Sequence, residues 1–222
     1  MDIYKTYDGS STLYSAEFQE HYHSRREGAL SESLYKHVLP ALSYVSNYKK
    51  NIKVLDICFG LGYNTFATLL YAKEHYPELE LQIYSPELDA NLIDLLAGFE
   101  YPLEFEPIKD VIKKTLHHHT YNSRSINIDI YIGRAEEYVK SLENESIDIV
   151  YQDAFSPKKN PTLWSEEFFA DIYKICTPKV ILTTYSSARA VKDNLKKAGF
   201  SVEKHIGEGF SKEGIKAFKT PS

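Results

Sequence analysis

The chain has 222 residues, of which 26 are basic and 31 acidic, so its formal net charge is −5. A content of 43% apolar and 14% aromatic residues excludes an intrinsically disordered chain, and no apolar run approaches the roughly 18 residues of a membrane span. Cys58 and Cys176 lie far apart in apolar surroundings, which indicates buried thiols and no disulfide framework. Because the first residues also lack the pattern of a signal peptide, we expect a cytoplasmic protein.

Strand-like and helix-like segments alternate along most of the chain. Apolar runs predict strands over residues 53–57, 79–84, 126–132, 147–152 and 180–184, and helical spacing predicts helices over residues 31–48, 64–75, 90–97, 164–176 and 188–198. Residues 201–218 have the pattern of an antiparallel strand pair. Short connections between alternating strands and helices imply parallel strands and right-handed crossovers. We therefore expect an α/β, Rossmann-like fold, with helices on both faces of a mostly parallel sheet and an antiparallel C-terminal strand.

The length of the chain suits one hydrophobic core. We expect a single domain over residues 1–222, in which residues 51–222 form the Rossmann-like core. Residues 1–50 lack the strand–helix alternation and form an N-terminal extension that contributes to the substrate site. In such a fold, ligands bind beyond the carboxyl ends of the strands.

A glycine-containing turn separates the first strand of the core from its first helix. Gly60 and Gly62 allow a close ligand approach that a side chain would prevent, although two glycines alone are a weak signal. A dinucleotide fingerprint would need a third glycine where this chain has Thr65, and Asp56 at the strand end would repel a pyrophosphate. A carboxylate there suits a cationic ligand such as S-adenosylmethionine, and Glu87 is placed to bind its ribose diol. The alternative is that Asp56 caps a turn and Glu87 is a surface acid.

The third strand ends at Gly133, in a corner that usually contacts the adenine in enzymes that use S-adenosylmethionine. Arg134 is a poor match for the acidic or polar group expected there. We therefore expect Glu136, or a backbone amide, to make the adenine contact.

An acid and a proline-stiffened loop follow the fourth strand. Asp153 lies at the carboxyl end of a central strand, where the reacting group of a substrate should meet the cofactor. Methylation of an amine needs an acceptor that orients the amine more than it needs a strong base. The alternative is that Asp153 caps the following turn, and Trp164 further along the loop is expected to be a core residue.

Three segments together resemble the methyltransferase domain of the MnmC family of tRNA 5-methylaminomethyl-2-thiouridine biosynthesis enzymes. They are residues 6–13 (TYDGSSTL) with 20–24 (EHYHS), the loop 56–64, and residues 153–157 (DAFSP) with Asn160, Pro161 and Trp164. Residues 183–186 and 198–200 fit as well, so the match covers essentially the whole chain. In larger family members a flavin-dependent oxidase follows this domain. Because this chain ends at Ser222, it resembles the stand-alone form, and no FAD is expected in it.

The resemblance implies transfer of a methyl group from S-adenosylmethionine to the 5-aminomethyl group of the wobble uridine, with the anticodon region of tRNA as the partner. Asp153 would meet the amine. The implied cofactor-binding residues are Asp56, Gly60, Gly62, Asn64 and Glu87, with Gly133 and Glu136 near the adenine. The implied substrate-binding residues are His21, His23, Ser24, Glu32, Phe155, Pro157, Asn160 and Tyr185.

The chain departs from the family pattern at two positions. Cys58 stands where the family commonly has the first glycine of its loop, and Arg134 stands where it commonly has an acid. Because cysteine is small, we expect cofactor binding to survive the first change. The second change leaves the adenine contact open.

The histidines do not predict a metal site. His117, His118 and His119 are consecutive, so regular structure cannot aim all three at one metal, and we interpret them as a helix end and loop. His21 and His23 alternate, so on an extended segment both would face one side, as a base-recognition face or simply a polar one.

Two other functions fit a sheet and cofactor loop of this kind. An aminopropyltransferase of the polyamine pathway would also use an acid after the fourth strand to activate an amine. A non-catalytic RNA-binding module could retain the fold as a relic. The histidine-containing N-terminal segment and the Asn160-Pro161 extension favour the tRNA enzyme, which we expect to be a monomer.

Overall fold

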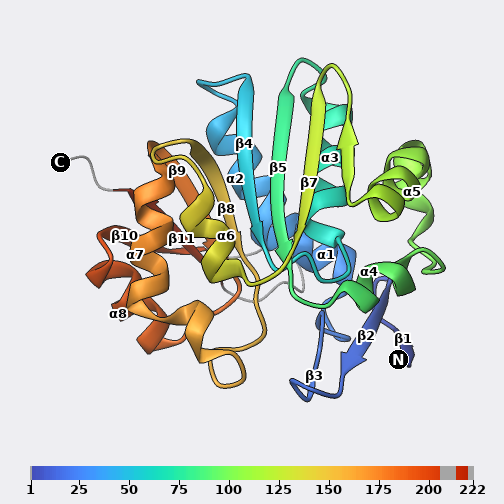
Figure 1. The fold of residues 1–222 in the computed structure, drawn as a ribbon, viewed down its shortest axis with the longest axis horizontal. Coiled ribbons are helices and arrows are strands. Elements are labelled where there is room, and N and C mark those ends of the chain that lie inside the picture. The colour runs from blue at the N-terminus through green and yellow to red at the C-terminus, as the bar shows by residue number, and fades with distance from the viewer. Residues whose placement is uncertain (1, 206–213, 220–222) are drawn as a thin grey trace.

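The computed structural model describes residues 2–205 and 214–219 and has an eight-stranded sheet at its centre (Figure 1). The strands are β4 (Asn51–Ile57), β5 (Glu80–Glu87), β6 (Thr120–Asn122), β7 (Ile126–Ile132), β8 (Ile147–Gln152), β9 (Cys176–Thr184), β10 (Phe200–His205) and β11 (Gly214–Lys219). Their order across the sheet is β10-β11-β9-β8-β4-β5-β7-β6. Strands β7, β5, β4, β8 and β9 are parallel, whereas β6 and β11 run antiparallel to their neighbours. The mostly parallel sheet and the antiparallel C-terminal strand are therefore confirmed.

Helices cover both faces of this sheet, as expected (Figure 1). One face carries α3 (Tyr63–His75), α4 (Ala90–Leu96), the 3-10 helix η2 (Leu103–Ile108), α5 (Lys109–His118) and an N-terminal run of α1 (Ala29–Glu32), the π-helical η1 (Ser33–Val38) and α2 (Leu39–Val45). The other carries α6 (Ala135–Ser141), α7 (Glu166–Ile175) and α8 (Arg189–Lys197), with the 3-10 helix η3 (Pro161–Trp164) before α7. Within residues 2–205 and 214–219, no helix has the length and apolar character needed to cross a membrane.

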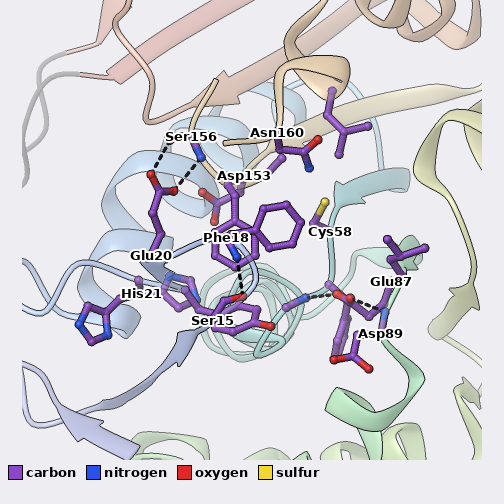
Figure 2. A pocket seen from close by; sticks show the side chains of 18 of the residues that line it. Ser15, Phe18, Glu20, His21, Cys58, Glu87, Asp89, Asp153, Ser156 and Asn160 are labelled. Carbon is purple, nitrogen blue, oxygen red and sulfur yellow. Dashed lines mark hydrogen bonds between the residues drawn. The ribbon is translucent and has the colours of Figure 1, made fainter. Parts of the chain in front are cut away.

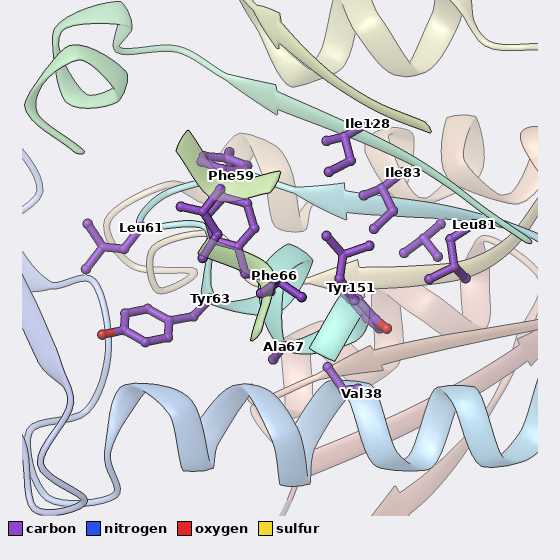
Figure 3. Close-up of a cluster of buried hydrophobic side chains, with 14 of the residues drawn as sticks. Val38, Phe59, Leu61, Tyr63, Phe66, Ala67, Leu81, Ile83, Ile128 and Tyr151 are labelled. Atoms are coloured by element: carbon purple, nitrogen blue, oxygen red, sulfur yellow. The ribbon is translucent and has the colours of Figure 1, made fainter. Parts of the chain in front are cut away.

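The core consists of two clusters, one on each face of the sheet. Successive strand residues alternate between them, so that Ile149 and Tyr151 of β8 join one cluster and Val150 the other. Figure 3 shows the first cluster, where Phe66 of α3 lies between the sheet and the helical run that carries Val38. This packing fixes the N-terminal helical run against the sheet, and with it the side chains that the run contributes to the site.

The first fifty residues contain more structure than their sequence predicts. Strands β1 (Ile3–Lys5), β2 (Ser11–Ser15) and β3 (Glu20–His21) form a separate antiparallel sheet. These strands have at most five residues, which is too short for an alternating pattern to stand out. Sequence reasoning also missed η2, α6, β6 and all of α5 except its histidine end.

Most expected elements occur within a few residues of their predicted ends. The strands over residues 126–132 and 147–152 match β7 and β8. The helix expected from residue 164 starts as α7 at Glu166, because the Ser165 side chain caps it by accepting a hydrogen bond from the backbone N–H of Phe168. The strand pair expected over residues 201–218 forms as β10 and β11, and its connection at residues 206–213 lies outside the described residues.

A proline explains the π-helical turn within the N-terminal helical run. Pro40 has no N–H, and in an α-helix its ring would clash with the carbonyl of Lys36, four residues earlier. The chain widens there, and the N–H of Leu39 donates to the carbonyl oxygen of Leu34, five residues earlier. Lys36 and His37 lie in this widened turn, and both are buried. Single π-helical turns often occur at functional sites.

The Thr6–Leu13 motif has a structural role. The Asp8 carboxylate accepts hydrogen bonds from the hydroxyl and N–H of Ser10 and from the N–H of Ser31 in α1. Gly28 precedes α1 with φ +97°, and a Cβ there would collide with the Asp8 carboxylate. The motif therefore attaches the small sheet to the start of the helical run.

Candidate active site

A cavity of about 1750 Å³ lies at the carboxyl ends of the central strands (Figure 2). Strand order reverses between β4 and β8, and an α/β sheet binds its ligand at such a switch point. The loops after β4, β5, β7 and β8 line one part of the cavity, and residues of the N-terminal extension between Tyr14 and Lys36 line another. In Figure 2, Asp153 lies between the Glu20–Ser156 pair and Cys58, with Glu87 further along.

The glycine loop after β4 needs its glycines for two different reasons. Gly62 has φ +74°, and a Cβ there would lie 2.7 Å from carbon atoms of the Phe59 and Phe66 rings. Gly60 has φ +54° and lines the cavity, and its N–H donates a 2.8 Å hydrogen bond to Oε2 of Glu87. Gly62 therefore allows the loop to pack, whereas Gly60 faces the ligand space.

Glu87 is oriented by the backbone rather than by a charged partner. Besides the bond from Gly60, its Oε1 accepts a 3.0 Å hydrogen bond from the N–H of Asp89. Burial raises the pKa of Glu87, and the backbone donors oppose that rise. Each carboxylate oxygen retains acceptor capacity toward the cavity, which the side chain lines.

Cys58 is the first residue of the loop and has a left-handed backbone, with φ +68°. This conformation strains residues that have a Cβ, so a glycine would adopt it with less strain than Cys58 does. The thiol is half-buried and lines the cavity, whereas Cys176 is fully buried; both cysteines are free.

Asp56 is completely buried behind the cavity rather than in its lining. Its Oδ2 accepts a 2.8 Å hydrogen bond from the Thr65 hydroxyl, and its Oδ1 lies 3.3 Å from Nδ2 of Asn64. Burial raises the pKa of Asp56 to about 7. Thr65, at the position where a dinucleotide-binding motif would have its third glycine, thus binds the Asp56 carboxyl. Asn64 lies between that carboxyl and the cavity.

Asp153 follows β8 and has two side-chain neighbours that come from distant parts of the chain. Nδ2 of Asn64 donates a 2.8 Å hydrogen bond to its Oδ2, and Nε2 of His37 lies 3.6 Å from its Oδ1. His37 is fully buried, and its Nδ1 lies 2.9 Å from the Thr183 hydroxyl. Sequence reasoning missed His37, because nothing in a helical stretch indicates that one residue reaches the end of a distant strand.

The loop after Asp153 is fastened to the N-terminal extension. The Phe155 ring stacks on Phe18 with centroids 4.3 Å apart, and the Glu20 carboxylate accepts hydrogen bonds from the N–H and the hydroxyl of Ser156. Of the predicted loop residues, Phe155 and Asn160 line the cavity, whereas Pro157 does not.

Behind that loop lie Tyr185, which lines the cavity, and Trp164, which is buried in the core as expected. The Tyr185 hydroxyl donates to the carbonyl oxygen of Ala154 over 3.0 Å. Burial, reinforced by the Asp153 carboxylate, raises the pKa of Tyr185 well above its usual value, so the hydroxyl stays protonated. The tyrosine therefore supports the backbone next to Asp153.

A buried ionic cluster forms the N-terminal side of the cavity. Lys36 Nζ lies 2.6 Å from Glu27 Oε2 and 2.8 Å from Glu32 Oε1, and Glu32 Oε2 lies 3.7 Å from His23 Nδ1. Although burial by itself raises the pKa of a carboxyl, His23 and Lys36 hold that of Glu32 well below its usual value. The N–H of Ser24 also donates to Glu32. Glu27 and Lys36 were not predicted, although the four-residue spacing of Glu32 and Lys36 suits a helical ion pair.

The two alternating histidines do not share one face. Strand β3 ends at His21, whose ring contacts Tyr4 and Tyr14. His23 instead packs edge-on against Tyr63. The chain turns between them, so the common face expected of an extended segment does not form.

The expected adenine corner lines the cavity at Gly133, Arg134 and Glu136. Arg134 Nη2 lies 2.7 Å from Glu136 Oε1. The arginine therefore forms an ion pair with Glu136, the acid that we expected to contact the adenine in its place. Elsewhere in the fold, α5 ends at His118, and His119 has a left-handed backbone, which confirms the helix end expected there. No group of three or more potential metal ligands occurs within residues 2–205 and 214–219.

The protein is similar to known methyltransferases. The model of a family described as "S-adenosyl-L-methionine-dependent methyltransferase" matches residues 105–220. A structure of MnmC2 from Aquifex aeolicus is 33% identical with a TM-score of 0.88, and the match covers all of this chain and 72% of that one. A probable spermidine synthase from Corynebacterium glutamicum is 13% identical with a TM-score of 0.53, which shows a shared fold alone.

Two curated relatives are longer than this chain. An uncharacterised protein of Methanocaldococcus jannaschii is 32% identical over 99% of this chain and 60% of its own length. The bifunctional tRNA 5-methylaminomethyl-2-thiouridine biosynthesis protein MnmC of Campylobacter hominis is 32% identical over 80% of this chain and 27% of its own. The chain thus spans less than two thirds of these relatives. From the family match and the extent of the likeness to MnmC2, the chain belongs to the S-adenosylmethionine-dependent methyltransferases of the MnmC2 type, and its cofactor is S-adenosylmethionine.

Proposed function

We propose that this methyltransferase methylates the primary amine of a 5-aminomethyl group on the wobble uridine of tRNA, giving 5-methylaminomethyluridine or its 2-thio form. The relatives named MnmC support tRNA as the substrate. The observation that carries the chemistry is Asp153, a carboxylate whose side chain is 11% exposed in the cavity, between Asn64 and His37. An amine that enters the cavity finds there an oriented acceptor.

The cavity residues fit the cofactor. S-adenosylmethionine has an ammonium and a carboxylate at one end and a ribose diol and adenine at the other. Oδ1 of Asn64 is buried and has no hydrogen-bond partner among the described residues, so it can accept from an ammonium. The Glu87 carboxylate, which accepts a hydrogen bond from the Gly60 N–H, would accept further hydrogen bonds from the ribose diol. Asp56 and Gly62 would support these residues from behind, and Gly133 and Glu136 would flank the adenine.

The cofactor supplies an electrophilic methyl group, and the protein must present a neutral amine to it. An alkylamine with a pKa of about 10.4 needs roughly 4–5 kcal/mol to lose its proton at pH 7. Only the neutral lone pair can form the new nitrogen–carbon bond while the carbon–sulfur bond electrons leave with sulfur. The nitrogen then has one proton in excess, which leaves to an acceptor.

Asp153 would serve as both guide and acceptor. A negative charge beside the amine favours the ammonium, so attraction alone would not help the reaction. By accepting a hydrogen bond from the amine N–H, Asp153 would aim the lone pair along the carbon–sulfur axis, and positioning of this kind accounts for a large part of a barrier. The same carboxylate can take the proton released after transfer.

The N-terminal extension and the loop after β8 would form the uridine pocket. His23, Ser24 and Glu32 line the cavity on one side, and Phe155, Asn160 and Tyr185 line it on the other. Lys36 is the partner of both Glu27 and Glu32, so its single positive charge offsets one of their two negative charges.

The test is a methyl-transfer assay. The protein is incubated with labelled S-adenosylmethionine and tRNA from a strain that lacks this methylation, and the nucleosides are analysed by mass. We expect a mass increase of one methyl group on 5-aminomethyluridine. Transfer from decarboxylated cofactor to putrescine would instead identify an aminopropyltransferase, and cofactor binding without any transfer would favour the non-catalytic module.

A further inference from the structure

The small N-terminal sheet has two different faces. Leu13 of β2 is fully buried and joins the core, so its neighbour Tyr14 points to the opposite face. His21 pairs directly with Tyr14, and its ring lies 5.1 Å from the Tyr14 ring and 4.8 Å from the Tyr4 ring. The guanidinium of Arg25 lies 5.0 Å from the Tyr4 ring centroid. We call Tyr4, Tyr14, His21 and Arg25 the aromatic face.

The aromatic face adjoins the cavity and is not part of the core. Tyr14, His21 and Arg25 line the cavity, and Figure 2 shows His21 on the side of the pocket away from Cys58 and Glu87. Tyr14 is 37% exposed, and Arg25 is exposed as well. Nδ1 of His21 is buried and has no hydrogen-bond partner among the described residues. The side chains of Tyr14, His21 and Arg25 are therefore available to a ligand at the mouth of the cavity, and Tyr4 supports His21 and Arg25 from beside it.

A nucleotide loop is the occupant that these groups suit. To reach Asp153, a wobble uridine must leave the stack of the anticodon loop, and its neighbours then lose a stacking partner. Aromatic rings and arginine planes are the groups on which proteins stack unpaired RNA bases. Arg25 and the adjacent Arg26 are both exposed and can meet the phosphates of such a loop.

We propose that the aromatic face stacks a base next to the wobble uridine while the uridine occupies the cavity. This inference rests on the proposed function, since it assumes an anticodon loop as the substrate. It assigns His21 to the neighbouring base instead of the uridine pocket that the family resemblance implies. Tyr14, which is 37% exposed, provides the stacking surface.

The test is a binding cycle with a synthetic anticodon stem–loop that carries 5-aminomethyluridine at the wobble position. Its dissociation constant is measured by fluorescence anisotropy, with intact neighbours and with an abasic site on either side of the uridine. We expect Tyr14→Ala to weaken binding about tenfold, the effect of losing one base stacked on one ring, and Tyr14→Phe to retain affinity. One of the two abasic sites should also weaken binding to the parent protein about tenfold. The same abasic site should cause little further loss of affinity in the Tyr14→Ala variant.

Tyr44 provides the matched control, because it is also 37% exposed but lies on α2, where it packs against Tyr48 and Phe218. Tyr44→Ala should leave the affinity for the stem–loop unchanged.

Three results would overturn the proposal. The first is an equal loss of affinity in the Tyr14→Ala and Tyr44→Ala variants. The second is an abasic site that weakens binding equally with and without Tyr14, and the third is a parent protein that does not bind the stem–loop. Normal methyl transfer with unchanged affinity of Tyr14→Ala would refute the stacking face alone, whereas absence of transfer from the parent protein would refute the proposed function. Affinity for S-adenosylmethionine, measured by calorimetry, checks that each variant is folded.

Discussion

The buried carboxyl of Asp56 makes the stability of this protein depend on pH in a direction that is unusual for an aspartate. Its pKa is about 7 in the folded chain against an ordinary value of 3.8, because burial disfavours the charged form. A group that binds its proton more tightly when folded stabilises the fold fully below the unfolded pKa, and this stabilisation is lost as the pH rises through the folded pKa. The interval from 3.8 to about 7 corresponds to about 4 kcal/mol at roughly 1.4 kcal/mol per pH unit.

The Asp56→Asn variant removes this titration while keeping the shape of the side chain. We expect its free energy of unfolding, relative to that of the parent, to rise by about 4 kcal/mol between pH 4 and pH 8. Urea denaturation of both proteins without cofactor, at several pH values, measures the difference. Other titrating groups are common to both proteins and cancel.

Asp148 is the matched control for that experiment. It is also buried in the sheet, but Lys49 pairs with it at 2.8 Å. Asp148→Asn removes the buried carboxylate of an ion pair whose lysine is partly exposed, and should lose stability at neutral pH. A parent–variant difference for Asp56→Asn that stays constant from about pH 5 to pH 8 would show that Asp56 ionises in the fold as it does in water, and would refute the reasoning.

Four further predictions concern catalysis, the cofactor loop and the substrate. Asp153→Asn should keep its contact with the cofactor loop and its affinity for S-adenosylmethionine, but lower the single-turnover rate by about two to four decades, the range of a positioned proton acceptor. Cys58→Gly should relieve the backbone at φ +68° and raise the free energy of unfolding in urea by about 0.5–1 kcal/mol, whereas Cys58→Ala should not. Gly62→Ala adds a Cβ 2.7 Å from two rings and should lose about 1–3 kcal/mol more than Gly9→Ala, which has φ +81° but nothing within 4 Å. Binding of tRNA should weaken steadily as salt rises, despite the net charge of −5, because phosphate contacts from side chains such as Lys158 release counterions.

Each of these outcomes has a clear opposite. Transfer by Asp153→Asn at near the parent rate would return Asp153 to a turn-capping role. Equal stabilities of the two Cys58 variants would mean that the left-handed backbone carries no strain. Equal losses in the two glycine variants would assign the whole effect to backbone conformation, and a flat salt response would favour a small-molecule substrate.

The sequence predicted the sheet best where a strand has a clear hydropathy pattern along its whole length. β7 matches its expected residues because isoleucines alternate with Asn127, Asp129 and Tyr131, which is the period-two pattern of a strand. β8 matches because most of its residues are apolar and all of them are buried. The short strands β1 to β3 and the π-helical turn at Pro40 gave no such pattern. The π-helical turn depends on a single missing N–H, which sequence periodicity does not register.

The site was predicted in part, and the missing part comes from tertiary contacts. Gly60, Glu87 and Asp153 lie together around the cavity because the order of strands and turns fixes where their ends meet. The neighbours that hold Asp153 and Glu32, namely His37 and Lys36, lie on a helix that carries no motif. Asp56 and Gly62 lie behind the cavity because they pack against α3. Their spacing in the sequence does not predict this packing.

The attachment of Glu20 to Ser156 has a consequence for how the enzyme is made. The two residues are 136 positions apart, so the N-terminal extension leaves the ribosome long before the loop that completes the cavity wall. At about 5–20 residues per second, that interval lasts roughly 7 to 27 seconds. During this time Phe18 has no Phe155 on which to stack, and Glu20 has no Ser156 from which to accept hydrogen bonds. A growing chain therefore has no complete site in which to capture a tRNA until the loop after β8 has been synthesised.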